Sequence, residues 1–242
     1  MGTIGNHLLA VLPARDRKRL LLLATAVPLD LSAVLVDAGE TPGYVYFPTS
    51  GFVSLVATTE GNPSLEVGMV GTEGMVGTQV VLGVVEAPVR ALVQGAGSAL
   101  RIPIHAFRLE LDSCKALKKT MDRYVHVINS QLTTSASCVR FHQVGPRLAR
   151  WLLMSHDRAQ SDTFRVTQEF LAYMLGARRS GISEAATLLQ REGLISYKRG
   201  EMTILDRPAL EAVSCSCYGA DLQCYVRTLG SSSVQPRGAT AH

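Results

Sequence analysis

The distribution of apolar residues changes twice along the chain, and each change marks a different kind of element. From residue 31 to residue 104, short apolar runs rich in Val, Thr and Tyr alternate with Gly and Pro. Such runs, bounded by turn residues, are typical of short β-strands. We expect strands at residues 35–38, 44–47, 51–58, 64–69, 89–94 and 97–102. Strands at this spacing, after an amphipathic N-terminal helix, predict a sandwich, barrel or jelly roll of about 75 residues.

From Ala106 the pattern becomes helical, with one stripe of mostly apolar positions at steps of 4, 3, 4, 4, 3 and 4. The stripe consists of Leu117, Met121, Tyr124, Ile128, Leu132, Ser135 and Val139. Its period is that of a coiled coil, so the helix packs either on its own β domain or on a second copy of itself. We favour the second alternative and predict a homodimer through residues 113–140. The pair Gly145-Pro146 is expected to end this helix and begin the next.

Residues 146–208 show a third pattern, in which short helices are followed by a hairpin. After a helix over 146–159, Thr167 is a suitable N-cap for a helix over 168–175, which Gly176 ends. A second helix over 177–192 ends at Gly193, and two short strands follow, joined by Lys198-Arg199-Gly200-Glu201. Two helices joined by a short turn and followed by a hairpin are the order of a winged helix-turn-helix.

The predicted second helix carries polar groups on the side that faces away from Ile182 and Leu189. These groups are Arg178, Arg179, Ser180, Glu184, Thr187 and Arg191. Most of them can hydrogen-bond base edges or phosphates, and the hairpin residues Lys198 and Arg199 can contact phosphates. The simpler interpretation is a solvated helix face with a soluble turn.

The charge distribution favours the nucleic-acid interpretation. The net charge is 24 − 20 = +4, and residues 140–208 alone carry 11 basic and 7 acidic side chains, so the whole excess lies in this segment. A local basic excess indicates a polyanionic partner. The longest uncharged run, residues 41–59, contains Pro and Gly and does not predict a membrane span. With no secretory signal, we expect a cytoplasmic protein without a membrane partner.

Five cysteines, an odd number without an export signal, indicate reduced thiols. Cys215, Cys217 and Cys224 form C-x-C-x6-C, which is no familiar zinc pattern because neither CxxC nor a nearby His completes it. We expect small buried side chains on a terminal helix, with metal binding or redox sensing as alternatives.

The run VTQEFLAYMLGARRSGISEAATLLQREGLISYKRGEMTILD, residues 166–206, resembles the DNA-binding domain of the Crp/Fnr family of bacterial transcription regulators. The resemblance implies an α+β fold with three parts. These are an N-terminal β-roll or jelly roll similar to a double-stranded β-helix (1–112), a dimerisation helix with a hinge (113–144) and a C-terminal winged helix-turn-helix (145–225). The tail, residues 230–242, is small and polar and is expected to be disordered.

The resemblance also assigns residues to DNA recognition. The family's three principal base-reading positions fall on Arg179, Ser180 and Glu184, where many relatives have Arg, Glu and Arg. Arg179 therefore keeps a guanine-reading role, while the other two imply a different operator. The predicted DNA-binding set is Thr167, Gln168, Arg178, Arg179, Ser180, Glu184, Lys198 and Arg199.

The sensor half departs from the family pattern. Members that bind cyclic AMP carry Gly-Glu and, about ten residues later, Arg-Ser. Here the first element is Gly71-Thr72-Glu73-Gly74, and Ala87-Pro88 stands where Arg-Ser is expected. Without that Arg, the cyclic phosphate lacks a counterion. We predict a ligand site of Gly71, Glu73, Gly74 and Arg90 that binds cyclic AMP weakly or not at all.

The sequence therefore predicts a dimeric, sequence-specific DNA-binding regulator that senses an unidentified signal and is not an enzyme. Its partners would be double-stranded DNA, a second copy, a small-molecule effector and, as the resemblance implies, RNA polymerase. No cofactor is indicated; the N-terminal cysteines of iron–sulfur members are missing. The alternatives are a regulator that needs no ligand and a cupin-like enzyme, although residues 31–104 contain no His to bind a metal.

Overall fold

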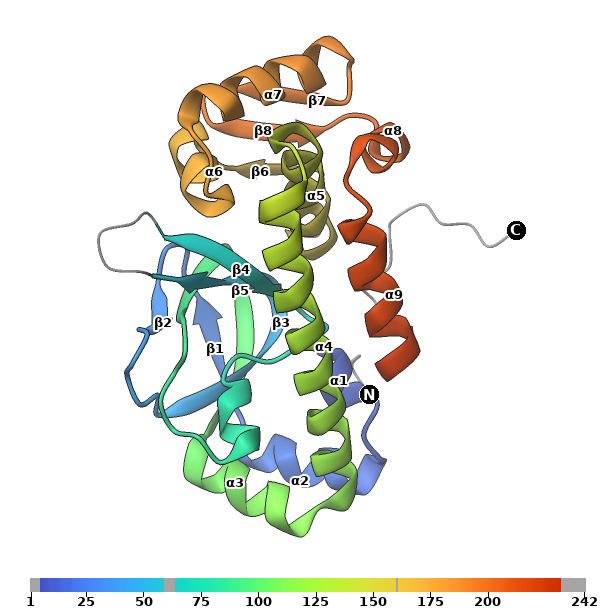
Figure 1. Cartoon of the computed structure of the whole chain (residues 1–242). Helices are drawn as coiled ribbons and strands as arrows, with labels where there is room; N and C mark the ends of the chain where they lie inside the picture. Colours follow the sequence, from blue (N-terminus) through green and yellow to red (C-terminus); the bar gives the residue numbers. More distant parts are fainter. Residues whose placement is uncertain (1–4, 59–63, 160, 232–242) are drawn as a thin grey trace.

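The computed structural model describes residues 5–58, 64–159 and 161–231. It consists of a β-roll with flanking helices, a long helix that runs beside it, and a smaller helical domain with a three-stranded sheet at the far end of that helix (Figure 1). The predicted α+β fold class is confirmed. Within the described residues, the helices are all too short or too polar to cross a membrane.

The β-roll is built on two long antiparallel strands. Its sheet has the order β1-β5-β3-β4, and β2 pairs with β5. The elements are α1 (His7–Ala10), α2 (Ala14–Leu23), β1 (Thr25–Leu29), β2 (Val34–Val36), β3 (Tyr44–Ala57), β4 (Leu65–Val70), the 3-10 helix η1 (Thr78–Leu82) and β5 (Arg90–Pro103).

Two pairs of predicted strands are continuous here, because their glycines form bulges where the sequence suggested turns. Segments 44–47 and 51–58 join as β3, and segments 89–94 and 97–102 join as β5. The register shifts around Gly51, whose φ is +70°. A Cβ atom there would lie 2.3 Å from the carbonyl oxygen of Gly95, so this crossing of two backbones requires glycine.

The long helix α4 (Lys115–Phe141) follows α3 (Ile104–Ser113) and packs on its own β-roll. Leu117, Met121 and Tyr124 share a core with Phe47 and Phe107. The first half of the predicted dimer stripe is therefore an intramolecular face, and Ile128 is buried in the same core. Only the later apolar positions, such as Leu132 and Val139, are more than a third exposed. The prediction that the whole stripe faces a second copy is wrong for its first four members.

The C-terminal domain contains the predicted winged helix-turn-helix. Its elements are α5 (Val144–Ala159), β6 (Thr163–Arg165), α6 (Gln168–Leu175), α7 (Arg179–Arg191), β7 (Ile195–Lys198), β8 (Glu201–Ile204) and α8 (Arg207–Val213), with sheet order β6-β8-β7. The break between α4 and α5 falls at His142 and Gln143, and Gly145-Pro146 lie inside the first turn of α5.

The last helix, α9 (Cys217–Leu229), leaves the winged domain and runs back along α4 (Figure 1). The Tyr225 hydroxyl donates to the carbonyl oxygen of Glu73 at 2.7 Å, and Tyr225 is buried in the core of the N-terminal half. The predicted boundary at residue 225 therefore assigns to the DNA-binding domain a helix that packs mainly on α4, although its N-terminal part also contacts α5. Of the predicted disordered tail, residues 232–242 lie outside the described residues.

Candidate DNA interface and domain junction

The two helices of the motif are positioned by local signals and by one apolar core. The Thr167 hydroxyl caps α6 by accepting from the Phe170 N–H at 3.1 Å. Gly176, at φ +56°, ends α6 in the left-handed conformation. Ile182 and Leu189 of α7 are buried in a core that also contains Leu152. The opposite face of α7 is consequently directed away from the domain.

Most residues of the predicted recognition surface are exposed. Arg179 is the first residue of α7 and Arg178 is its N-cap, and both side chains are solvent-accessible, as are Ser180 and Glu184. A helix N-terminus carries unpaired N–H groups and a positive dipole end, both of which suit an anion. This end of α7 therefore offers hydrogen-bond donors and positive charge together.

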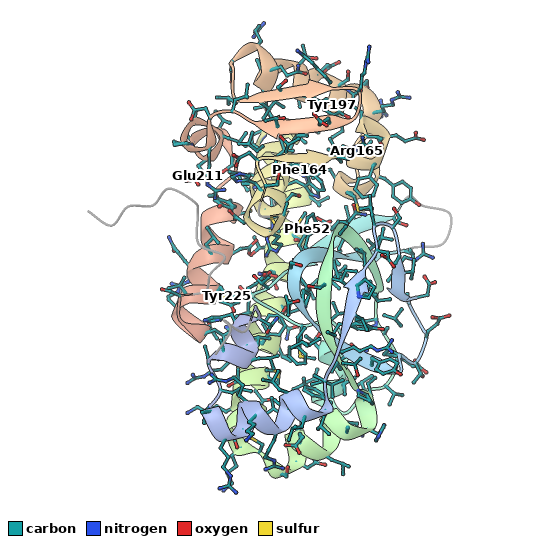
Figure 2. The ribbon with its side chains drawn as sticks, turned by 180° about the vertical axis from the view of Figure 1, so that it is seen from behind. Phe52, Phe164, Arg165, Tyr197, Glu211 and Tyr225 are labelled. Atoms are coloured by element: carbon teal, nitrogen blue, oxygen red, sulfur yellow. The ribbon has the colours of Figure 1, made fainter. Side chains whose placement is uncertain are left out.

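The hairpin after α7 forms a basic wing. Lys198 pairs with Glu201 in register, and the two turn residues Arg199 and Gly200 have φ values of +52° and +79°. Two successive positive φ angles define a type I′ turn, which holds Lys198 and Arg199 out in solvent. Arg165, on the paired strand β6, is also exposed and was not among the predicted residues (Figure 2).

Thr167 and Gln168 lie at the N-terminus of α6, where Thr167 is exposed and Gln168 is half-buried. The Thr167 hydroxyl oxygen is used as a cap, so its O–H and the free helix N–H groups are the donors left for a phosphate.

The predicted ligand residues occupy two different places. Glu73 is buried, and its carboxylate pairs with Arg158 of α5, with Nη2 to Oε1 at 2.7 Å and Nε to Oε1 at 2.8 Å. It also accepts from the Gly71 N–H. Arg90 instead pairs with Asp37, and both side chains are about 40% exposed. The guanidinium that neutralises Glu73 therefore comes from the DNA-binding domain, a partner that the sequence did not indicate.

The two glycines beside Glu73 are required by close packing. A Cβ at Gly71 would lie 2.8 Å from Cγ of Arg158, and one at Gly74 would lie 2.0 Å from the Tyr124 hydroxyl. These glycines therefore let the loop after β4 approach α4 and α5 closely. The predicted ligand segment is part of the junction between the two halves of the chain.

The apolar core also crosses this junction. Phe52 and Met69 of the β-roll are buried in the same cluster as Trp151 and Leu152 of α5. Figure 2 shows Phe52 at the level where the β-roll meets the winged domain, with Phe164 beyond it. In addition, the Ser64 hydroxyl donates to the Tyr173 hydroxyl of α6 at 3.2 Å. The β-roll thus contacts both α5 and the first helix of the motif.

Inside the β-roll, a cavity of about 30 Å³ lies beside Ala87 and Pro88 and is lined further by Tyr44, Tyr46 and Val76. Pockets for small molecules usually measure about 300–1,000 Å³. A cavity of this size holds about one water molecule and not a nucleotide.

All five cysteines are buried, and for Cys215, Cys217 and Cys224 this was predicted. However, Cys215 and Cys217 meet Cys138 and His142 from the end of α4. The sequence pattern did not indicate these two residues as neighbours, because they lie more than 70 positions earlier in the chain.

The fold and the exposed α7 face define a DNA-binding protein of the winged helix-turn-helix class. Residues 146–213 match the family model for the Crp-like helix-turn-helix domain, so this chain carries a Crp-like DNA-binding domain, as the sequence predicted for this segment. Its class is that of transcription regulators and not of cupin-like enzymes.

Solved structures agree in fold. One is a transcriptional regulator assigned to the Crp/Fnr family from Eubacterium rectale (16% identity, 86% of this chain and 98% of the other, TM-score 0.66). Another is the c-di-GMP responsive global regulator CLP of Xanthomonas campestris (19% identity, 80% of this chain and 100% of the other, TM-score 0.64). A third is a CRP-family regulator of Thermus thermophilus (18% identity, 78% of this chain and 96% of the other, TM-score 0.65). A comparison with curated proteins finds no match.

Proposed function

We propose that the protein is a homodimeric regulator that binds a near-palindromic operator, with α7 in the major groove and the β7–β8 wing on the phosphate backbone. The observation that carries this proposal is the exposed N-terminal end of α7, where Arg178 and Arg179 lie next to Ser180. In helix-turn-helix proteins this end of the second helix contacts base edges. We assign Arg179 to base reading and Lys198, Arg199, Thr167 and Gln168 to phosphates.

The dimer would use only the C-terminal part of the predicted stripe of α4, because the first four members of that stripe are buried against the β-roll. The exposed positions Leu132, Ala136 and Val139 follow steps of 4 and 3, and Phe141 beyond them is 75% exposed. This short apolar stripe, which we call the distal stripe, lies on the part of α4 nearest the winged domain (Figure 1). Pairing there would bury exposed apolar area and place two recognition helices about a two-fold axis.

Signal transfer in the proposed regulator goes through Glu73 and Arg158. Burial alone would lower the pKa of the Arg158 guanidinium, but the carboxylates of Glu73 and Asp157 raise it overall, so it stays charged. A buried ion pair that loses one partner leaves an uncompensated charge, which is costly. Any event that moves the loop around Glu73 must therefore move α5 with it, and α5 is the first helix of the DNA-binding domain.

The effector is proposed not to be cyclic AMP, and the cavity of about 30 Å³ beside Ala87 and Pro88 supports this. RNA polymerase remains a proposed partner on the strength of the family resemblance, and the cytoplasm a proposed location.

The test of the proposed function is selection of a bound site from random double-stranded DNA with the full chain, followed by binding measurements on that site. We expect enrichment of a site with two inverted halves about 34 Å apart. Enrichment of a single half-site, or of no sequence at all, would contradict the proposal.

A further inference from the structure

Three thiols and one imidazole converge where α4 ends and α9 begins. Cys138 lies in the last turn of α4 and His142 directly follows that helix, while Cys215 and Cys217 precede and begin α9. The four donor atoms, three Sγ atoms and one ring nitrogen, all lie within 4.8 Å of one another. Cys138 and Cys215 are 77 positions apart, so only the fold assembles this set.

The distances between the donors fit the coordination sphere of one ion. Sγ of Cys138 lies 3.6 Å from Sγ of Cys215, and Sγ of Cys217 lies 3.5 Å from Nδ1 of His142. In a tetrahedral zinc site, bond lengths of about 2.3 Å to sulfur and about 2.05 Å to nitrogen give edges of about 3.8 Å and about 3.6 Å. The sulfur pair is far from the bonding distance of a disulfide, about 2.05 Å.

The backbone holds these donors in place. Cys138 and His142 are four residues apart at the end of α4, which brings their side chains to one side. On the other segment, the Cys215 N–H donates to the carbonyl oxygen of Pro146 at 3.2 Å, which ties this residue to α5. The three cysteines are at most 7% exposed. Four protein donors in a closed position are the pattern of a structural metal site.

The surroundings supply positive charge to the thiols. Arg147 and Arg150 both interact electrostatically with Cys138 and Cys215. Zn²⁺ with three thiolates and a neutral imidazole carries a net charge of −1. Two guanidinium groups beside such a centre stabilise the thiolates and orient them.

We propose that Cys138, His142, Cys215 and Cys217 bind one zinc ion as a Cys3His site. Thiolate and imidazole donors at tetrahedral spacing select zinc over Mg²⁺ or Ca²⁺, which require oxygen ligands. One ion accounts for four donors within 4.8 Å, whereas an iron–sulfur cluster spreads its ligands over several irons. Binding releases the thiol protons to solvent and involves no redox step.

The zinc ion would clamp the hinge of the molecule. Cys138 and His142 come from the end of α4, next to the break before α5, and Cys215 and Cys217 come from the start of α9, so the ion joins the long helix to the segment that leaves the winged domain. This positional role rests on the proposed function, while the metal site itself does not.

The first experiment measures metal in the untagged full chain, purified under reducing conditions and dialysed after exposure to zinc. We expect one zinc per chain, and substitution of the ion by Co²⁺ should give the visible absorption of a tetrahedral thiolate complex. Cys217→Ser should lose most of the metal. Cys224→Ser is the matched control, because Cys224 is equally buried on α9 but does not belong to the four-donor set; it should retain the metal.

A second measurement covers the case in which a cysteine variant does not fold. His142 is only half-buried, so His142→Ala should fold, and competition with a zinc indicator should show binding weakened by at least about tenfold. Absence of zinc and Co²⁺ from the folded, reduced wild type would overturn the proposal. Equal loss from Cys224→Ser and Cys217→Ser would overturn it too, as would isolation of the chain with a Cys138–Cys215 disulfide and no metal.

The clamp is tested separately by operator binding before and after zinc removal from the wild type. We expect affinity to fall by at least about tenfold and to return when zinc is restored. Unchanged affinity in a chain that binds one zinc would overturn the clamp and leave the metal site standing. If the zinc-loaded wild type bound no DNA sequence-specifically, that result would instead contradict the proposed function.

Discussion

Arg158 of α5 closes a buried ion pair with Glu73 of the β-roll, with 2.7 Å between Nη2 and Oε1, and so links the two halves of the chain through charge. Both side chains are less than 10% exposed. Arg158 also donates from Nη1 to the carbonyl oxygen of Met154 at 3.0 Å, and Glu73 accepts from the Gly71 N–H. Each charge is thus held by its own element as well as by its partner.

Removing one member of this buried pair should lower the free energy of unfolding much more than removing one member of an exposed pair. We expect Glu73→Ala to lower the free energy of unfolding by about 3–5 kcal/mol, because Arg158 is left buried and charged. Arg90→Met is the matched control, since its pair with Asp37 is about 40% exposed and should contribute at most about 1 kcal/mol. Urea unfolding of both variants measures the difference. Similar losses in the two would mean that burial does not govern this pair.

The double variant Glu73→Gln with Arg158→Met tests the coupling itself. It removes both charges, so it should be more stable than the sum of the single effects predicts. Purely additive effects would indicate that the two side chains stabilise the junction independently.

Glu66 of β4 predicts a pH dependence of stability. Burial raises the pKa of its carboxyl from 4.5 to about 7, and a hydrogen bond from Ser54 opposes this only in part. Between these pH values the folded chain binds more protons than the unfolded chain, so stability falls as pH rises. Glu66→Gln should therefore raise the free energy of unfolding by about 1–3 kcal/mol at pH 8 and have no such effect at pH 4.

The measurement is urea unfolding at the two pH values, with the exposed Glu192→Gln as control. That control should change stability by at most about 0.5 kcal/mol at either pH. A gain for Glu66→Gln that is the same at pH 4 and pH 8 would show that its carboxyl is not the group that titrates.

The winged helix-turn-helix could be predicted from the sequence because its signals are local. Thr167 caps α6, Gly176 and Gly193 end the two helices, and a basic two-residue turn closes the hairpin, all within 41 residues. The elements of the β-roll were predicted less well. Residues 48–50 and 95–96 were predicted to separate short strands, whereas two long strands continue through them and cross at Gly51 and Gly95, and β1 was not predicted at all.

Features that depend on distant residues could not be predicted. Glu73 and Arg158 are 85 positions apart, and a Glu resembling the family's ligand residue gives no sign that an arginine of another domain neutralises it. The apolar stripe of α4 was predicted correctly, but its periodicity does not indicate whether the β-roll of the same chain or a second copy of the chain covers it. Tyr124, for example, is 2% exposed because the β-roll covers it, not a second copy.

The distal stripe of α4 predicts which substitution separates the dimer. Val139→Asp places a charge in the proposed apolar contact, where its desolvation is costly. We expect a monomer at micromolar concentration by analytical ultracentrifugation, against a dimer for the wild type. Leu109→Asp on α3 is the control, because Leu109 is 68% exposed and lies outside the distal stripe; it should remain dimeric. A wild-type monomer, or a dimer that tolerates Val139→Asp, would contradict the assigned face.

The last prediction separates base reading from phosphate binding. Arg179 begins α7, so Arg179→Ala should cost about 1–3 kcal/mol of operator binding and relax the preference for one base pair in each half-site. Lys198 lies in the wing, and Lys198→Ala should weaken all sequences alike, because a phosphate contact does not read sequence.

Salt dependence distinguishes the two variants further. Each lysine that no longer neutralises a phosphate should reduce the slope of log affinity against log salt by about 1, and hence by about 2 for the homodimer, which loses Lys198 from both subunits. The Lys198→Ala slope should therefore be flatter than that of the wild type, while single-base operator variants should bind in the same order of affinity. The measurement is a salt-titrated binding assay on the selected operator and on its single-base variants. If Arg179→Ala weakens every operator variant equally, Arg179 does not read a base and the docking assigned to α7 is wrong.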